Sequence, residues 1–257
     1  MLKRLILLFF KPLFRNHVYT LRHGLGKGFK IKGGLGFLKP SQKAAPEELF
    51  LLNRNFDGKT IYDIGSYVGV TTMFFAKAVG KAGKVIAFEP NPANAKALKQ
   101  NLALNDWDNI MIMEAGVGEK RETKTLMYDP DALATGSMDD AIQAQLMRIT
   151  HAKVTVEIYP LDHYVDADIL PVPDFVKIDV EGMEYEVLRG MKNIMMQHRP
   201  ELYIELHGVG EKDKMANAQK VFELLESYNY TINHVETGQP ASAKNIHNIK
   251  EGHFSCT

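Results

Sequence analysis

Short apolar runs alternate with segments of helical character over most of this chain. The runs VIAF, FVKI and LYIEL are rich in Val, Ile, Phe and Leu, and segments long enough for helices separate them. Such runs are typical of parallel strands that are buried on both faces of a sheet. Because strands and helices alternate, the pattern predicts a doubly wound α/β fold with right-handed crossovers.

The elements expected from this pattern follow one another regularly after residue 45. The expected strands cover residues 59–64, 84–88, 110–115, 175–180, 202–206, 230–236 and 252–256, with a hairpin-like pair at 124–128 and 154–159. The expected helices cover residues 46–53, 69–79, 92–104, 184–196 and 213–227. We therefore expect a Rossmann-like sheet that is mostly parallel and has an antiparallel C-terminal strand.

Composition divides the chain into two parts. Residues 1–46 carry ten Lys and Arg side chains and no acid, whereas the rest of the chain has a net charge of −10. We assign residues 1–45, with a short strand at 29–32, to a basic, apolar N-terminal extension and residues 46–257 to one domain. Within the domain, residues 129–152 are a polar, Met-rich insertion, which is either a lid over the site or a solvated surface helix.

The N-terminal segment MLKRLILLFFKPLF has an apolar stretch of six residues, from Leu5 to Phe10. A transmembrane helix needs about 20 such residues, and a signal peptide about 7–15. The segment either packs on the domain as a first helix, or residues 1–43 attach the protein to an anionic membrane surface. The single cysteine, Cys256, excludes an internal disulfide and fits a reducing compartment. We expect a cytoplasmic location, either free or peripheral on the inner membrane face.

The segment TIYDIGSYVGVTT predicts a ligand-binding turn where the first strand of the domain ends. Asp63 precedes Gly65 and Gly69, and the residues between these glycines do not complete the G-x-G-x-x-G pattern of dinucleotide sites. An acid at this place is unfavourable beside a pyrophosphate and suits a ligand with an ammonium or sulfonium charge. The next strand ends in AFEP, so Glu89 lies where an acid accepts hydrogen bonds from ribose hydroxyls. The two signals together indicate an adenosine ligand.

The segments YDIGSYVGVTTMFFAKAVG, GKVIAFEPNPAN, PLDHYV, PDFVKIDVEGMEYEVLRGM and RPELYIELHG resemble the FkbM-type family of S-adenosylmethionine-dependent methyltransferases. The resemblance covers about residues 58–208, and KIDVEGMEYEVLRG is its most specific block. It implies a methyltransferase sheet with S-adenosyl-L-methionine as cofactor. It also implies O-methylation of a hydroxyl on a sugar, lipid-linked or secondary-metabolite acceptor.

The resemblance also assigns residues to the cofactor. The turn at the methionine end of the cofactor comprises Asp63, Gly65, Ser66, Tyr67 and Gly69, and the acid at the ribose is Glu89, followed by Pro90. The turn that borders the adenine comprises Gly116, Val117 and Gly118, and the motif that faces the transferred methyl comprises Asp179, Glu181 and Gly182. Tyr67 departs from the family pattern, which usually has a small polar side chain or His there. Its ring either closes over the cofactor or points outward.

Methyl transfer to an alcohol requires alignment of the acceptor and benefits from a base. Three catalytic candidates follow the later strands: Asp179, Glu205 and His207. His207 has the most suitable ordinary pKa for a base, although a supporting role is equally open to it, and Asp179 is favoured for positioning. These side chains and Glu181 are metal donors by type, but their spacing matches no metal motif, so we expect a site without metal.

Two other functions compete with methyl transfer. A nicotinamide-dependent oxidoreductase would need the dinucleotide glycines that are missing between Gly65 and Gly69. A non-catalytic, membrane-associated nucleotide-binding protein would account for the basic extension but not for the acids at the strand ends. We expect a small-molecule or glycan acceptor and no nucleic acid, because the domain lacks an aromatic-interleaved basic platform and an NPPY-like motif.

Overall fold

The computed structural model describes residues 17–33, 44–128, 136–137, 152–208, 210–247 and 251–257. The segment expected as a lid or surface helix lies almost wholly outside these residues, as do residues 1–16 of the basic extension. Within the described residues, no helix is both long and apolar enough to cross a bilayer.

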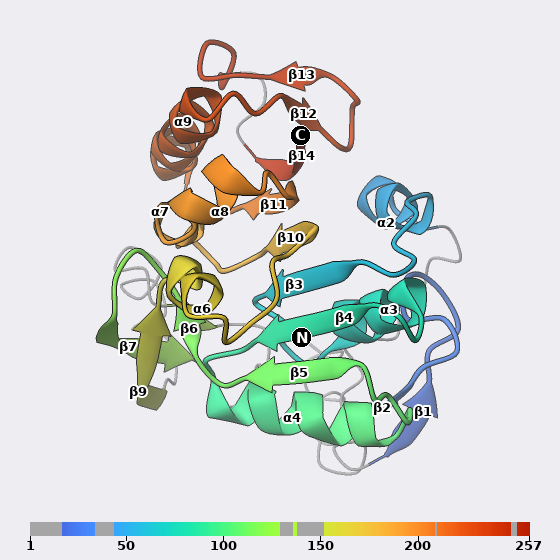
Figure 1. Ribbon diagram of the computed structural model, residues 1–257. Coiled ribbons are helices and arrows are strands. Elements are labelled where there is room, and N and C mark those ends of the chain that lie inside the picture. The colour runs from blue at the N-terminus through green and yellow to red at the C-terminus, as the bar shows by residue number, and fades with distance from the viewer. Residues whose placement is uncertain (1–16, 34–43, 129–135, 138–151, 209, 248–250) are drawn as a thin grey trace, which may run out of the picture.

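Eight strands of the described chain form the central sheet (Figure 1). In spatial order they are β13 (Pro240–Ala241), β12 (Ile232–His234), β14 (Gly252–Cys256), β11 (Glu201–Leu206), β10 (Phe175–Ile178), β3 (Thr60–Ile64), β4 (Lys84–Phe88) and β5 (Ile110–Met113). The five strands from β11 to β5 are parallel, and β14 pairs antiparallel with β11. The predicted doubly wound, mostly parallel sheet with an antiparallel C-terminal strand is confirmed.

A smaller sheet lies beside the central one (Figure 1). Its strands within the described residues are β6 (Gly116–Val117), β9 (Ala152–Tyr159), β7 (Glu122–Tyr128) and β8 (Gly136–Ser137). β7 and β9 pair antiparallel, as predicted for this hairpin-like pair. The strand predicted at residues 110–115 ends at Met113, and the chain then enters the smaller sheet through β6.

The helices of the described chain are α2 (Pro46–Leu52), α3 (Val70–Val79), α4 (Pro92–Ala103), α6 (Leu161–Asp166), α7 (Glu184–Arg189), α8 (Lys192–Gln197) and α9 (Glu211–Ser227). The prediction of one helix over residues 184–196 was wrong. Gly190 separates α7 from α8 because its Cα packs against the backbone of Gly118, where a side chain would collide. The carboxylate of Asp162 then accepts hydrogen bonds from the first turn of α8, at Asn193 N and Ile194 N, both at 3.0 Å.

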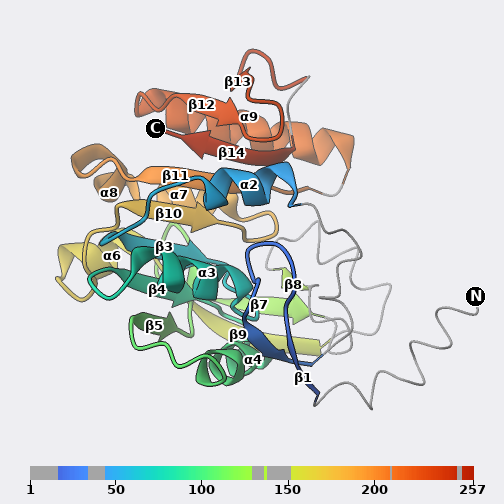
Figure 2. The ribbon, with the colours of Figure 1, turned by 90° about the vertical axis from the view of Figure 1, so that its right-hand side faces the viewer.

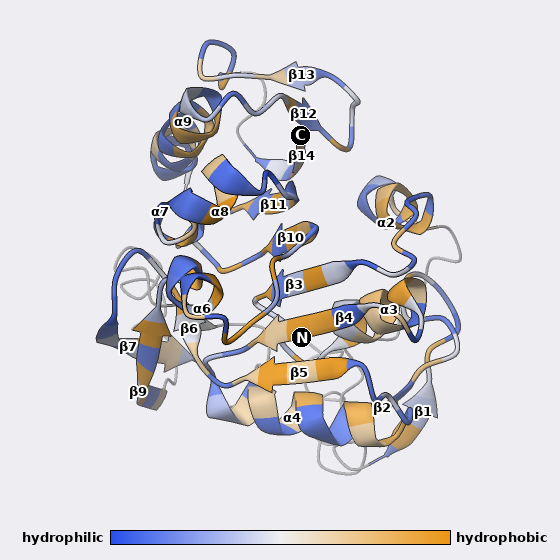
Figure 3. Cartoon of the chain, in the orientation of Figure 1, coloured by the Kyte–Doolittle hydropathy of each residue, from blue (hydrophilic) through white to orange (hydrophobic). Residues whose placement is uncertain are grey.

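Alternating residues of the central strands face opposite layers, as the strand period requires. Tyr62, Val176 and Ile204 belong to the apolar cluster under α6 to α9, whereas Ile61 and Phe175 belong to the cluster under α3. The hydropathy view shows the apolar strands between helices with polar outer faces (Figure 3). Because of the same alternation, the polar residues near the end of each strand face the layer that contains α3, and the site lies on this side.

The described part of the basic extension packs on the domain. Residues 17–33 form a hairpin of β1 (Val18–Thr20) and β2 (Lys30–Lys32) beside α4 (Figure 2). Ile31 is fully buried in the cluster under α3. The side chains of Asn101 and Asn105 accept hydrogen bonds of 2.8 Å from the backbone of β2. The hairpin thereby becomes a wall of the domain.

Candidate functional site

The carboxyl ends of β3, β4, β10 and β11 meet at one edge of the sheet, where ligands bind in open α/β folds (Figure 1). The turn after β3 starts at Gly65, whose φ is +81°. A Cβ at this position would overlap the carbonyl oxygen of Asp179, so the close approach of the two strand ends requires glycine. The amides of Gly65 and Ser66 donate to the carbonyl of Phe88, both at 3.0 Å, which joins the turn to β4.

Glu89 lies directly after β4, and its side chain points into this turn. Its carboxylate accepts hydrogen bonds of 2.8 Å from the amides of Tyr67 and Asn91, one on each oxygen. Only 5% of Glu89 is exposed, and this burial raises the pKa of its carboxyl to about 7. Tyr67, the departure from the family pattern, adopts a left-handed backbone with φ of +53°, which turns its amide toward Glu89.

A cavity of about 280 Å³, here called the cofactor cavity, opens along these strand ends. Most of the residues predicted for the site line it. They are Gly65, Tyr67, Glu89, Pro90, Gly116, Val117, Asp179, Glu181, Glu205 and His207. Its volume lies near the lower end of the range for small-molecule sites, about 300–1,000 Å³.

Five residues predicted for the cofactor lie outside this lining: Gly118 and Gly182, and three residues in or next to the turn after β3, namely Asp63, Ser66 and Gly69. Asp63 is fully buried and accepts a hydrogen bond of 2.7 Å from the hydroxyl of Thr72. The hydroxyl of Ser66 donates to the carbonyl of Asp63 at 2.8 Å. Gly69 caps α3 with φ of +90° and packs against Leu98. Asp63, Ser66 and Gly69 therefore stabilise the turn without lining the cavity.

Lys177 is a central residue of the site that the sequence analysis missed. Its ammonium lies 3.3 Å from Asp63 Oδ1 and 3.2 Å from Asp179 Oδ2, and it donates to the carbonyl of Gly65 at 3.3 Å. Burial acts to lower the pKa of Lys177, but the two carboxylates outweigh it and hold the pKa above its usual value. The β3–β10 register places Lys177 opposite Asp63, so the pairing follows from the strand alignment.

His207 follows β11 and faces several acids. Its Nδ1 is hydrogen bonded to Glu184 Oε1 at 3.0 Å, and the Glu184 side chain is fully buried. Its Nε2 lies 3.5 Å from Glu205 Oε1 and 3.8 Å from Asp179 Oδ1. Burial acts to lower the pKa of His207, but the hydrogen bond to Glu184 and the other carboxylates outweigh it and raise the pKa to about 11. Glu184 therefore orients a predicted catalytic side chain from the first turn of α7.

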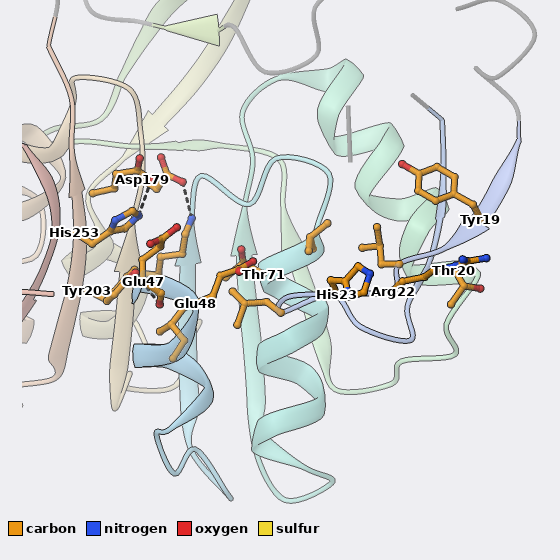
Figure 4. A pocket seen from close by; sticks show the side chains of 17 residues that line it. Tyr19, Thr20, Arg22, His23, Glu47, Glu48, Thr71, Asp179, Tyr203 and His253 are labelled. Atoms are coloured by element: carbon orange, nitrogen blue, oxygen red, sulfur yellow. Dashed lines mark hydrogen bonds and ion pairs between the residues drawn. The ribbon is translucent and has the colours of Figure 1, made fainter. Parts of the chain in front are cut away.

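A larger cavity of about 840 Å³ adjoins the cofactor cavity. The 17–33 hairpin, α2, the start of α3 and the ends of β10, β11 and β14 form its walls. Figure 4 shows Asp179, Tyr203 and His253 at one end of it and Tyr19, Arg22 and His23 toward the other. Asp179 and Glu205 line both cavities.

His253, on β14, was also missed by the sequence analysis. It lies opposite Glu205 in the antiparallel register of β11 and β14. Its Nε2 is 3.2 Å from Glu205 Oε2, and its Nδ1 is 2.7 Å from Glu236 Oε1. Burial acts to raise the pKa of Glu205, but the interactions of its carboxylate with the imidazoles of His207 and His253 outweigh it and lower the pKa below its usual range. The site is thus a closely coupled set of acids and imidazoles.

Among the described residues, Asp179, Glu205 and His207 are a group with the donor atoms and proximity to hold a metal ion. One ligand atom from each lies within 4.8 Å of the other two. The expectation of a metal-free site was drawn from sequence spacing alone, which says nothing about strands brought together by the sheet.

Comparison with known protein families identifies the family of this chain. The model of the methyltransferase FkbM domain matches residues 63–232, about two thirds of the chain. The chain belongs to this family. S-adenosylmethionine is therefore its cofactor, as predicted. The assignment of its ribose to the buried Glu89, which lines the cofactor cavity, stays a prediction. Family membership does not favour the oxidoreductase or the non-catalytic binding protein.

Individual relatives are distant from this chain. The hexuronic acid methyltransferase AglP of Haloferax volcanii is 28% identical over 164 residues, which cover 63% of this chain and 62% of AglP. Methyltransferase 1 of Beauveria bassiana is 26% identical over 190 residues, which cover 68% of this chain and 74% of that protein. The crystal structure of a methyltransferase FkbM from Methylobacillus flagellatus is 18% identical, with a TM-score of 0.49, over 80% of this chain and 45% of that one.

Proposed function

We propose that this protein transfers the methyl group of S-adenosylmethionine to a hydroxyl of a sugar, lipid-linked or secondary-metabolite acceptor. The observation that carries the proposal is the meeting of the two cavities at Asp179 and Glu205. One cavity has the residues of an adenosine site, and the other is open to a second molecule. An in-line displacement needs two reactants that approach one point from opposite sides.

On the cofactor side, Glu89 would accept hydrogen bonds from the ribose hydroxyls, and backbone amides already hold its two oxygens in place. When bound, the cofactor supplies an electrophilic methyl group on a positively charged sulfur. The carboxylates of Asp179 and Glu181 border this part of the cavity and favour a cation there. Gly65 and Tyr67 bring backbone close to the ligand.

On the acceptor side, Asp179 and Glu205 accept a hydrogen bond from the reacting hydroxyl and hold its oxygen in line with the methyl. When the acceptor oxygen takes the methyl group and the sulfur leaves, the hydroxyl proton would pass to the carboxylate of Asp179 or Glu205, because the raised pKa of His207 keeps that ring protonated near neutral pH. The predicted catalytic residues thus work as one group. Lys177 keeps Asp179 in place, and His253 does the same for Glu205.

The larger cavity supports a polar, hydroxyl-rich acceptor. Charged and aromatic side chains such as Arg22, His23 and Tyr203 stand in its walls. Arg22 suits an acceptor that also carries an anionic group, and the similarity to a hexuronic acid methyltransferase supports the same class.

The test is transfer from S-[methyl-¹³C]adenosylmethionine to paired acceptors, namely hexose glycosides and their hexuronic acid counterparts. We expect a ¹³C methyl ether that survives alkali, which would cleave a methyl ester. Glu205→Gln should reduce kcat at least tenfold while binding of adenosylhomocysteine is kept, and Glu157→Gln, on an exposed position of β9, should leave both unchanged. Label found on nitrogen or carbon, or as a methyl ester, would contradict methylation of a hydroxyl.

A further inference from the structure

Asp179, Glu205 and His207 bring three potential ligand atoms to the boundary between the two cavities. Asp179 follows β10, Glu205 lies within β11, and His207 follows that strand. The parallel pairing of the two strands puts these residues side by side. From this arrangement and the contacts around it, we propose that the three side chains bind a divalent cation of the Mn²⁺ or Mg²⁺ class.

Each of the three side chains is anchored through one polar atom and presents its other polar atom to the same point. The anchoring contacts are Lys177 Nζ to Asp179 Oδ2 at 3.2 Å, His253 Nε2 to Glu205 Oε2 at 3.2 Å and Glu184 Oε1 to His207 Nδ1 at 3.0 Å. The remaining carboxylate atoms, Asp179 Oδ1 and Glu205 Oε1, both lie near His207 Nε2, and one ligand atom of each residue lies within 4.8 Å of the other two. Outer partners that fix the orientation of the ligands are the rule in protein metal sites.

The separations between the facing atoms fit ligands better than hydrogen-bonded partners. His207 Nε2 lies 3.8 Å from Asp179 Oδ1 and 3.5 Å from Glu205 Oε1. Hydrogen bonds from ring nitrogen to oxygen are about 2.7–3.2 Å long. Two ligands held at about 2.1–2.3 Å from one ion, at angles of 90–110°, stand about 3–4 Å apart.

The anchors are themselves held in place. Glu184, which is fully buried, also accepts hydrogen bonds from the amide of Gly182 at 3.0 Å and from Asn217 Nδ2 at 2.8 Å. On the other side, Glu236 holds His253 at 2.7 Å. A site whose outer contacts are fixed in this way needs little rearrangement to receive an ion.

The charge around this point also favours a cation. The carboxylates of Asp63, Asp179, Glu181, Glu184 and Glu205 lie close together there. Lys177 balances one of these charges, and the ion would take the place of a proton on His207 Nε2. Carboxylates that are partly removed from water need further compensation, which a divalent ion supplies.

The two carboxylates of the donor set favour the Mn²⁺ and Mg²⁺ class of ion. Two carboxylates and one imidazole suit Mn²⁺ or Mg²⁺, and the three protein ligands leave further coordination positions open. Because Asp179 and Glu205 line both cavities, those positions face the larger one. If the proposed function holds, an acceptor hydroxyl occupies one of them; binding of the ion itself does not depend on that function.

The experiment is a titration of the full-length, EDTA-treated protein with Mn²⁺, without cofactor, followed by the loss of the free-ion electron paramagnetic resonance signal. We expect one saturable site per chain, from which Mg²⁺ displaces Mn²⁺. Glu205→Gln and His207→Gln should weaken Mn²⁺ binding at least tenfold, and Glu184→Gln, an outer contact, about 10- to 100-fold. His198→Gln, a substitution of an exposed histidine in the turn after α8, is the matched control and should bind as the unchanged protein does.

Binding of adenosylhomocysteine is measured on each protein in parallel, so that a variant that does not fold is recognised. Loss of Mn²⁺ with retained adenosylhomocysteine binding in Glu205→Gln is the supporting result. Absence of a Mn²⁺ site in a protein that binds adenosylhomocysteine overturns the cation proposal and leaves the methyltransferase proposal standing. Equal Mn²⁺ binding by all variants also overturns it, because the ion would then sit elsewhere.

Discussion

Replacement of Glu89 by Gln keeps the size of a buried side chain and removes the charge that should hold the cofactor ribose. The two oxygens of Glu89 accept hydrogen bonds from Tyr67 N and Asn91 N. A glutamine has one oxygen, so its NH₂ group must face one of those amides. A hydrogen bond to a charged group contributes about 1.5–3 kcal/mol, so losing one should weaken adenosylhomocysteine binding about 10- to 150-fold.

The same residue predicts a pH dependence of binding. Burial raises the pKa of Glu89 to about 7, the amides of Asn91 and Tyr67 and the side chain of Asn94 act to lower it, and Lys177 lowers it from a greater distance. The ionised form binds the ribose, so affinity is present above the raised pKa and is lost as the pH falls through it. Between pH 8 and pH 6 the ionised fraction falls from about 0.9 to about 0.1, which weakens binding about tenfold.

The assay is calorimetric titration with adenosylhomocysteine at pH 6, 7 and 8, in two buffers of different ionisation enthalpy to count released protons. The amine of the ligand titrates as well, so the quantity of interest is the difference between the unchanged protein and Glu89→Gln. The control is Glu114→Gln, an exposed acid that follows β5. The reasoning is refuted if Glu89→Gln binds within twofold of the unchanged protein, or if both show the same pH profile.

Three further predictions concern stability and the turn at Gly65. Lys177→Met should lower the free energy of unfolding by about 3–5 kcal/mol, because the carboxylates of Asp63 and Asp179 lose their partner. Urea unfolding measures this loss, with Lys84→Met at an exposed position as the control. An equal loss in the two variants would contradict the prediction. Gly65→Ala should abolish adenosylhomocysteine binding, because the added Cβ collides with the backbone of Asp179. Gly58 has a similar φ but open space around it, so Gly58→Ala should lower the free energy of unfolding by only about 1–2 kcal/mol. Equal behaviour of the two variants would show that the collision is absent. Ile31→Ala should lower the free energy of unfolding, measured with heat or urea, by about 2–4 kcal/mol, because Ile31 is buried. Val18→Ala, at an exposed position of the same hairpin, should have a small effect. Similar losses in the two variants would contradict the packing of the hairpin on the domain.

The central strands and the turn at Gly65 could be predicted because they depend on local pattern. A buried parallel strand has a recognisable apolar run, and the acids that follow such runs fall at one edge of the sheet. Glu89, Asp179, Glu205 and His207 were located by that reasoning, and the structure places all four around the cofactor cavity.

Residues whose neighbours come from distant parts of the chain could not be found in this way. Lys177 lies inside the run FVKI, and its charge becomes meaningful only when the β3–β10 register sets it opposite Asp63. His253 depends in the same manner on the pairing of β14 with β11. The break at Gly190 depends on contact with Gly118, about 70 residues away in sequence. Strand register and close backbone packing are set by the whole fold.

The most direct test of the account is a crystal structure of the protein with adenosylhomocysteine. The account predicts the ligand in the cofactor cavity, with both ribose hydroxyls on the Glu89 carboxylate and the sulfur facing the boundary marked by Asp179 and Glu205. The larger cavity would then open directly in front of the sulfur. A ligand bound with its ribose away from Glu89, or with its sulfur turned from that boundary, would contradict the proposed site of methyl transfer.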